Sequence, residues 1–426
     1  MKNKYELIVV GGGFAGVAAA ISAARHGVDV LLIEKYNCLG GAAVSQLVLP
    51  FMPYWTQMPV TLERKFLCGG LFLEIFEEMN KLTDPEGKSG FNKLLYFDEE
   101  ILKLVLNRMA IASGVKLLFN TTVTEVEAEN GNIKSIKALG KSKVLELEAD
   151  TFIDATGDGE LSMLAGCSYK LGREKDSLCQ PMTLCFRMSG VDREKYNQNQ
   201  KRINELYKEL REKGVIKNPR ENVLVFHNYN DGVLHFNTTR VVKRNPTDPF
   251  DVTEAEIEAR EQVFEMLSFL KNNFEGFENA RILSTALQIG IRESRKIEGE
   301  YTLTVDDLTS LARFDDAIAV SNYSIDIHSP DGTGTYQWYF GDGEWYEIPY
   351  RCLIPKGMNN LLVAGRCISS THEAQASFRV MPYCSEIGQA AGVAVAVAKK
   401  NATTVRDVDI KEVQKILISE DFAINS

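Results

Sequence analysis

The fold is decided by two stretches of the sequence, YELIVVGGGFAG at residues 5–16 and LLIE at residues 31–34. They predict a buried strand, a glycine turn, an alanine-rich helix and a second buried strand that ends in an acid. Gly11 permits the tight turn, Gly13 lets backbone amides approach a pyrophosphate, and Gly16 lets the helix pack closely on the sheet. This order of elements predicts a βαβ unit that binds a dinucleotide.

The start of this helix and the end of the second strand would supply the ligand contacts. Unpaired N–H groups and the positive end of the helix dipole would face the phosphates. Glu34 is placed to accept hydrogen bonds from an adenosine ribose. One alternative interpretation is a secretory signal, but Glu6 begins the apolar run and three glycines interrupt it. Another is a glycine turn that binds nothing.

The composition is that of an ordinary globular protein. The 426 residues are 45% hydrophobic and 25% charged, which is enough for two or three structural units. A formal net charge of −10 argues against nucleic acid as a partner, because phosphate binding requires clustered lysine and arginine. The apolar run at residues 387–398 is too short to cross a bilayer, so no membrane partner is expected. These features predict a cytoplasmic protein.

The eight cysteines are scattered along the chain, without CxxC pairs or metal-ligand spacing. Such a distribution indicates neither a zinc site nor an iron–sulfur cluster. We therefore predict no metal site, and we expect reduced thiols.

The rest of the chain predicts mixed α and β structure. Predicted helices cover residues 70–81, 98–113, 193–213 and 383–399, and a Thr253–Glu256 capping box begins another that carries Ile257, Phe264, Leu267, Leu270 and Phe274 on one side. Predicted strands cover residues 115–119, 122–129, 132–139, 145–147, 151–154, 182–188, 223–229, 233–237 and 360–364. Asn130-Gly131 predicts a hairpin turn, and residues 84–88 predict a loop.

Three separated segments resemble the FAD-binding domain of the glutathione-reductase-like flavoproteins. They are the glycine motif at 11–16 with Glu34, FIDATGD at 152–158, and LLVAGR at 361–366 before a helix rich in small residues. The finer resemblance, over residues 5–398, is to a bacterial group called FAD-dependent oxidoreductases. Its marks are CLGG at 38–41, QPMT at 180–183, GIRESR at 290–295, IPYR at 348–351 and GRCIS at 365–369.

The resemblance implies an α/β fold. A discontinuous Rossmann-like FAD-binding domain, of the ββα sandwich type, would carry an inserted α+β substrate domain. The FAD-binding domain would comprise residues 1–43, 98–166 and 351–400. Substrate or cap regions would comprise residues 44–97 and 167–350, and residues 401–426 would form a C-terminal tail.

The resemblance also implies which residues bind FAD. They are Gly11, Gly13, Phe14, Ala15, Gly16, Glu34, Lys35, Gly40, Gly41, Val123, Ala155, Thr156, Gly157, Gly365, Arg366 and Gly388. The helix beginning near Pro382 would aim amides at the flavin N1–C2=O edge, where reduced flavin is negatively charged. Related disulfide reductases have Gly-Asp where this chain has Gly365-Arg366, so a carboxylate hydrogen bond to the ribityl chain is not implied.

Glu34 alone fits either FAD or a nicotinamide dinucleotide. The segments at 155–157 and 365 favour FAD, because a nicotinamide domain does not need a returning third segment. The chain has no second GxGxxG motif, and Cys38 has no partner in a redox CxxxxC. Disulfide reduction is therefore not expected, despite the resemblance.

The predicted catalytic group lies between the third nucleotide-binding strand and its helix, where the flavin ring should sit. His372, next to Glu373, could act as base towards an alcohol or amine, or as acid towards an enone. Equally, it could hold a loop or the cofactor in place. Arg379 could bind a substrate carboxylate or hydroxyl, or a flavin phosphate.

Other polar side chains are candidates for the substrate side. They are His235, Asn237, Arg240, Arg292, Glu293, Arg295, Tyr350 and Arg351, the last two by reaching the flavin. Arg240 is also interpreted as a surface ion partner, and Arg292, Glu293 and Arg295 as a structural ion-pair cluster. His328 is interpreted as a turn residue.

The function predicted from these features is hydride transfer between flavin N5 and a small polar substrate, such as a sugar, polyol, hydroxy acid or amine. The electron acceptor or donor is not specified. The alternatives are a flavin-dependent tRNA-modifying protein, which the acidic balance disfavours, a flavin sensor without turnover, and an alkene reductase resembling fumarate reductase.

Overall fold

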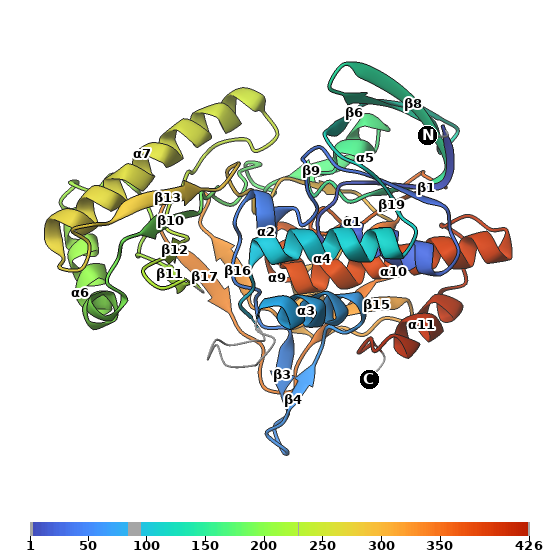
Figure 1. Ribbon diagram of the computed structural model, residues 1–426. Coiled ribbons are helices and arrows are strands. Elements are labelled where there is room, and N and C mark those ends of the chain that lie inside the picture. Colours follow the sequence, from blue (N-terminus) through green and yellow to red (C-terminus); the bar gives the residue numbers. More distant parts are fainter. Residues whose placement is uncertain (1–2, 84–94, 229, 425–426) are drawn as a thin grey trace.

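A parallel sheet forms the centre of the computed structural model, which describes residues 3–83, 95–228 and 230–424. Its strand order is β5 (Lys116–Leu118), β2 (Val30–Ile33), β1 (Lys4–Val10), β8 (Lys143–Asp154) and β19 (Leu361–Val363). Strand β19 returns from near the C-terminus to pair with β8 (Figure 1). The predicted α/β class with a discontinuous Rossmann-like core is confirmed.

Helices α1 (Phe14–Arg25) and α10 (Met381–Asn401) pack against each other beside this sheet (Figure 1). The contact is close because α10 has glycine where it meets α1. A Cβ added at Gly388 would lie 2.0 Å from the carbonyl oxygen of Ala15, and one at Gly392 would lie 2.3 Å from that of Ala19. Helices α3 (Gly70–Thr83) and α4 (Glu99–Ala112), both predicted, pack near the same pair.

An antiparallel meander extends one edge of the sheet. Strands β6 (Thr121–Glu129) and β7 (Asn132–Gly140) form the predicted hairpin, and Asn130 and Gly131 both have positive φ in its turn. The two short strands predicted at 145–147 and 151–154 are one long strand, β8. Its first half pairs with β7 and its second half with β1 and β19.

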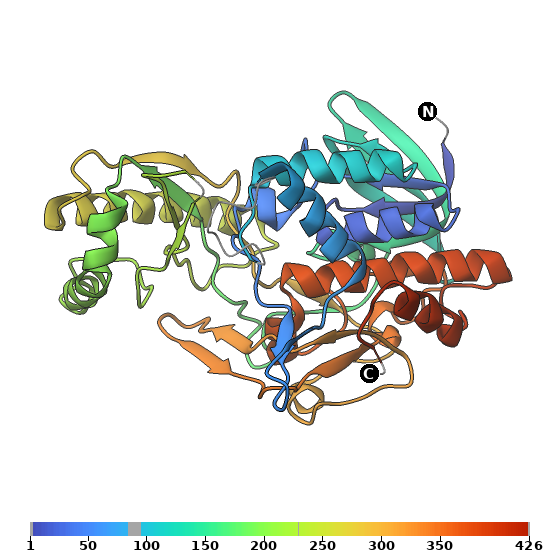
Figure 2. The same cartoon turned by 60° about the horizontal axis from the view of Figure 1, so that its bottom comes forward.

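A second unit stands to the left in Figures 1 and 2 and has its own apolar core. Its sheet has the strand order β11 (Val225–His227), β12 (Leu234–Phe236), β10 (Phe186–Ser189) and β13 (Arg281–Thr285), and it carries helices α6 (Arg193–Glu212) and α7 (Pro249–Asn273). The strand predicted over 182–188 begins only at Phe186. Before it, Met182 and Thr183 make isolated bridges to Val241 and Gly290.

Helix α7 corrects two predictions. It begins at Pro249 with Asp248 as its N-cap, so the Thr253–Glu256 capping box is wrong, and the Thr253 hydroxyl instead bonds to the carbonyl of Pro249. The predicted apolar side is only partly correct: Leu270 and Phe274 are buried, but Ile257 and Phe264 are 59% and 57% exposed. The buried face contains Ala255, Ala259, Gln262, Val263, Met266, Phe269 and Leu270.

Smaller elements complete the part of the chain that the structure describes. The strands are β3 (Trp55–Gln57), β4 (Arg64–Phe66), β9 (Tyr169–Leu171), β14 (Arg295–Ile297), β15 (Ala317–Ser321), β16 (Ile325–His328), β17 (Thr335–Trp338) and β18 (Tyr346–Pro349). The helices are α2 (Ala42–Ser45), α5 (Glu160–Leu164), α8 (Val305–Thr309), η1 (Tyr350–Leu353), α9 (His372–Phe378) and α11 (Ile410–Ser419). The loop predicted at 84–88 lies outside the described residues.

The two apolar cores show how the segments associate. The core around the parallel sheet also includes residues of α3, β15, β18 and α11, whereas the other core contains Leu47 and residues between Met182 and Ile289. The domain boundaries given above remain predictions.

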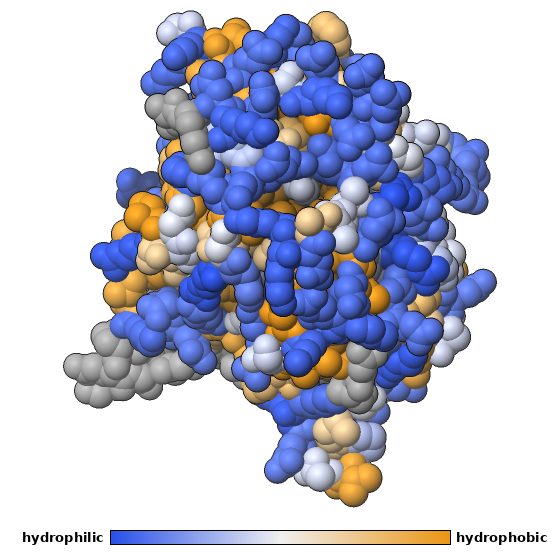
Figure 3. Space-filling view, turned by 90° about the vertical axis from the view of Figure 1, so that its right-hand side faces the viewer, coloured by the Kyte–Doolittle hydropathy of each residue, from blue (hydrophilic) through white to orange (hydrophobic). Residues whose placement is uncertain are grey.

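Hydrophilic residues predominate on the face shown in Figure 3, while the tip of the β3–β4 hairpin projects below it. Val60 and Leu62 in that tip are 92% and 67% exposed. Within residues 3–83, 95–228 and 230–424, no helix is long and apolar enough to span a membrane.

We expect Gly388→Ala to lower the free energy of unfolding by about 1–3 kcal/mol, because the backbone must shift to admit the methyl group. The loss should appear although alanine favours a helix over glycine by about 1 kcal/mol. Urea unfolding followed by circular dichroism measures it. Gly13→Ala is the control, because its Cβ would lie 3.8 Å from the nearest atom, Gly41 Cα. Equal stability of both variants would contradict the packing argument.

Buried Glu386 of α10 generates a prediction about pH. Burial raises its pKa from 4.5 to about 8, and one carboxyl oxygen accepts a hydrogen bond from Gly69 N at 3.1 Å. The folded protein therefore keeps a proton that the unfolded chain releases above pH 4.5. Between pH 5 and about 8, wild type should lose up to about 1.4 kcal/mol per pH unit relative to Glu386→Gln. Parallel stability–pH curves for the two proteins would refute the assignment.

Candidate functional site

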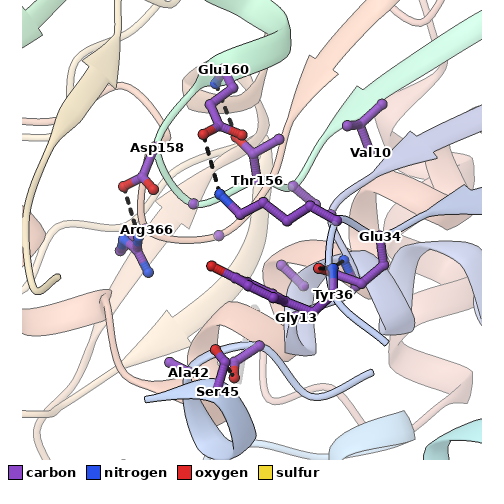
Figure 4. Close-up of a pocket in the computed structure, with 18 of the residues that line it drawn as sticks. Val10, Gly13, Glu34, Tyr36, Ala42, Ser45, Thr156, Asp158, Glu160 and Arg366 are labelled. Carbon is purple, nitrogen blue, oxygen red and sulfur yellow. Dashed lines mark hydrogen bonds and ion pairs between the residues drawn. The ribbon is translucent and has the colours of Figure 1, made fainter. Parts of the chain in front are cut away.

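A first cavity opens at the carboxyl ends of β1, β2, β8 and β19, which is where ligands bind in open α/β sheets. Its wall brings together the three segments that the resemblance singled out (Figure 4). Of the predicted FAD-binding residues, those that line it are Gly11, Gly13, Phe14, Ala15, Glu34, Lys35, Gly40, Gly41, Val123, Ala155, Thr156, Gly157, Gly365 and Arg366.

Two predicted cofactor residues do not line this cavity. A Cβ at Gly16 would lie 1.8 Å from the carbonyl oxygen of Gly11, and Gly388 meets Ala15 in the α1–α10 contact. Both glycines allow close packing of backbone segments, which is the role that the sequence predicted for Gly16, and their assignment as cofactor contacts stays a prediction.

The N-terminus of α1 has the features of an anion site. Gly13 is its N-cap, and no side chain caps the helix. The unpaired amides of its first turn are therefore available at the cavity wall, and open space lies around Gly13. Helix α10 likewise begins without a side-chain cap, and its first residue, Met381, lines the same cavity.

The acid at the end of β2 faces the glycine turn. Oε2 of Glu34 accepts a hydrogen bond from Gly12 N at 2.6 Å, and Oε1 accepts one from Tyr36 N at 2.8 Å. Nearby, Lys35 Nζ lies 3.2 Å from Glu160 Oε1 (Figure 4). The Tyr36 hydroxyl contacts the side chain of Gln288, which also lines the cavity and follows β13 of the second unit.

Arg366 is paired with a carboxylate in the cavity wall, and this carboxylate is not among the predicted site residues. Its Nη2 lies 2.8 Å from Asp158 Oδ1, to which Ser294 Oγ also donates at 2.6 Å. Burial opposes the charge on Asp158, but Arg366 and Ser294 hold its pKa below the usual value. The wall of the first cavity thus carries an ion pair between Arg366 and Asp158 (Figure 4).

A second cavity, of about 400 Å³, lies next to the first. The two share Ala42, Gln46, Ile291, Arg366, Arg379 and Met381 in their walls. Apolar side chains cover part of the second cavity, namely Val48, Pro50, Met52, Leu224, Phe226, Ile291, Val380 and Met381. A volume of this size suits a small organic molecule.

The polar wall of the second cavity is built around Asp326. Arg379 Nη2 and His328 Nε2 each lie 3.3 Å from Asp326 Oδ2, and the Tyr323 hydroxyl lies 3.4 Å from the same atom. His328 Nδ1 lies 3.0 Å from Nη2 of Arg240. Burial and the charge of Arg292 lower the pKa of His328 to about 3, so the imidazole is neutral at pH 7.

These contacts correct two interpretations. His328 is not a turn residue, because it ends strand β16 and its ring lines the second cavity. Arg240 is not a surface ion partner, since it is 1% exposed and its guanidinium lies 3.2 Å from Glu221.

His372 and Glu373, the predicted catalytic pair, border neither of these two cavities. His372 begins α9, and its Nδ1 lies 2.8 Å from Oε2 of Glu293. Glu293 also accepts hydrogen bonds from Lys296 Nζ at 2.6 Å and from Gln180 N at 3.0 Å. Glu293 thus belongs to a buried ion-pair cluster, one of its two proposed roles. Arg379, by contrast, lines both cavities.

Of the other candidate residues, some line the second cavity and others line neither cavity. Asn237 and Arg292 line the second cavity. His235 is 1% exposed and lines neither cavity. Tyr350 and Arg351, expected near the flavin, are also absent from both walls: the Tyr350 hydroxyl donates to Val405 O, and Arg351 pairs with Asp316.

Several cavity residues were missed by sequence reasoning. They are Thr183, Arg220, Glu221, Tyr323, Asp326 and Asp158. Only Thr183 and Asp158 lie in motifs singled out beforehand. The others come from loops and short strands without a local signature.

The first cavity fits FAD, because its glycine turn, its uncapped helix start and the acid at the end of β2, Glu34, all line it. Among the described residues, no group of three or more His, Cys, Asp or Glu side chains is placed to hold a metal ion.

Known proteins resemble this chain over part or nearly all of its length. It is 31% identical over 190 residues to digeranylgeranylglycerophospholipid reductase of Methanocella arvoryzae, which covers 42% of this chain and 46% of the relative. Digeranylgeranylglycerophospholipid reductase 1 of Methanococcoides burtonii is 26% identical over 202 residues. The match covers 45% of this chain and 46% of the relative. The chain thus spans less than half the length of these curated relatives.

A solved structure of a geranylgeranyl bacteriochlorophyll reductase-like protein from Thermoplasma acidophilum aligns over 99% of this chain and 84% of its own, with a TM-score of 0.49 and 14% identity. The sequence itself matches the FAD dependent oxidoreductase family over residues 6–417, which is nearly the whole chain. This protein is therefore a member of the FAD-dependent oxidoreductase family, and its cofactor is FAD.

Proposed function

We propose that the second cavity binds a small polar organic substrate and that a hydride moves between this substrate and N5 of FAD. The observation that carries the proposal is the shared wall: Ile291, Arg379 and Met381 border both the cofactor cavity and its neighbour. A substrate in one cavity would therefore lie beside a cofactor in the other.

When bound, FAD supplies the hydride chemistry. In the oxidative direction, a substrate C–H bond breaks and both electrons leave with the hydrogen, while a hydroxyl or ammonium proton leaves separately. We assign that proton to the Tyr323–Asp326–His328 group, because these polar side chains line the substrate cavity. Within that group Asp326 is the proton acceptor, because Arg240 already donates to the lone-pair nitrogen of neutral His328, Nδ1, and the apolar wall excludes water.

The proposal divides the predicted catalytic residues. Arg379 stays in the site, where Asp326 holds it at 3.3 Å and it can orient the substrate. His372 becomes a positioning residue that acts through Glu293. The glutathione-reductase-like character of the FAD domain is also part of the proposal, supported by the three separate segments around one cavity.

A second candidate is reduction of a carbon–carbon double bond, which the names of the relatives support. The direction is then reversed: hydride adds to one alkene carbon and a proton to the other. The same cavity wall would serve both reactions.

Gly13→Val should weaken FAD binding at least tenfold while the chain stays folded, because the side chain would grow into the open space beside the α1 amides. Titration of apoprotein with FAD, followed by flavin fluorescence, measures the change. Val123→Ala, on the same cavity but without added volume, is the control. Undiminished affinity in Gly13→Val would contradict this placement of the pyrophosphate.

Anaerobic mixing tests the reaction. A hydroxy acid, polyol, sugar or amine that is a substrate should bleach the oxidised flavin, and an alkene substrate should restore colour to protein reduced with dithionite. Asp326→Asn should slow the reactive case by at least tenfold, since general acid–base catalysis contributes about 10²–10⁴-fold. Failure of every compound in both directions would refute the substrate proposal.

A further inference from the structure

We infer that the second cavity binds an organic carboxylate between Arg220 and Arg292, so the substrate class is an organic acid rather than a neutral polyol, sugar or amine. The inference rests on the proposed function in taking this cavity as the substrate site. Its basis is an imbalance of buried charge that belongs to the cavity wall.

Four arginines line the second cavity, and two of them have carboxylate partners. Arg366 pairs with Asp158 at 2.8 Å, and Arg379 pairs with Asp326 at 3.3 Å. The remaining carboxylate of the wall, Glu221, lies 3.2 Å from Arg240. Arg220 and Arg292 are left without any carboxylate within 4 Å among the residues that the structure describes.

Arg220 is held in place while its charged end stays available. The residue is 5% exposed, and Nε donates to Asn222 Oδ1 at 3.0 Å. Within the described part of the chain, neither terminal nitrogen has a hydrogen-bond partner, and neither is completely sealed from solvent. Arg220 also lines the cavity.

Arg292 is anchored from one side only. Its Nη1 donates to Pro181 O at 2.8 Å and to Thr183 Oγ1 at 2.6 Å, whereas Nη2 makes one long contact of 3.4 Å with Asn237 Oδ1. All three partners are neutral. The guanidinium is therefore fixed in orientation, and Asp326, which already pairs with Arg379 and His328, offsets its charge only from a distance.

The electrostatics of the wall favour an anion. Burial, and then the charges of Arg379 and Arg220, lower the pKa of Arg292 to about 9, so the guanidinium groups repel one another but remain protonated at pH 7. Neutral His328 does not compensate them. Burying a charge without a partner is costly, and a carboxylate bound by guanidinium N–H groups removes this cost through charge-assisted hydrogen bonds.

The opposite wall argues for an organic anion. Val48, Pro50, Met52, Leu224 and Phe226 are apolar and belong to the same cavity. A bare inorganic anion would leave this surface uncovered, whereas an organic acid would contact it with its carbon chain. The two arginines would then fix the carboxylate, and the carbon chain would fill the remaining space.

Isothermal titration of the FAD-loaded protein at constant ionic strength tests the inference. The probes are lactate, succinate and fumarate, the neutral amides lactamide and succinamide, and inorganic phosphate. At least one carboxylate should bind at least tenfold more tightly than its amide and than phosphate. Arg220→Gln and Arg292→Gln should each weaken that binding at least tenfold with FAD content unchanged.

Two further variants serve as controls for this test. Arg202→Gln changes an exposed arginine of α6 and should bind the carboxylate like wild type. Arg292→Lys keeps the charge but loses the paired N–H geometry, so it should recover part of the affinity that Arg292→Gln loses. It also replaces Arg292→Gln if that variant does not fold.

The outcomes separate this inference from the proposed function. Carboxylate binding that depends on both arginines, without flavin bleaching or recolouring by any acid, would support the anion site and refute the redox role. Flavin bleaching by a neutral polyol, unchanged in Arg220→Gln and Arg292→Gln, would refute the anion site alone. Binding of phosphate as tightly as the carboxylates, or no binding by any probe, would also overturn the inference.

Discussion

The close contact between α1 and α10 is the constraint on which the rest of the structure depends. Gly388 and Gly392 let the C-terminal helix touch the backbone of the first helix at Ala15 and Ala19. This contact holds the end of the chain beside its beginning, so β19 can join β8 and Gly365 can complete the cavity begun by Gly11. The pairing of β1 with β8 joins the other two segments directly, so the α1–α10 contact matters most for the segment around Gly365.

The cofactor half was predictable because its requirements are local. A glycine turn, an uncapped helix start and an acid after a short strand each leave a pattern within a few residues, and the structure places most of them on one cavity. The exceptions, Gly16 and Gly388, are instructive. The place of Gly16 in the glycine motif predicted its packing role, whereas Gly388 lies in no such motif, and only its three-dimensional neighbours show that it serves backbone packing.

The substrate side could not be predicted in the same way. Arg220, Tyr323 and Asp326 come from loops and short strands far apart in the sequence, and they meet only after the second unit has folded against the first. His372 attracted attention because it follows the third nucleotide-binding strand, but its ring points to buried Glu293 rather than to a cavity. The prediction of the apolar side of α7 was also partly wrong, since several large side chains in that helix remain exposed.

Tyr36 and Gln288 have a consequence for the shape of the cofactor cavity. One follows the second strand of the βαβ unit and the other follows β13, and their side chains meet at the wall of the first cavity, with Gln288 also bonded to Ser45 at 3.3 Å. The wall of the cofactor cavity is thus joined across both units, so its shape depends on how these units pack together and not on the βαβ unit alone.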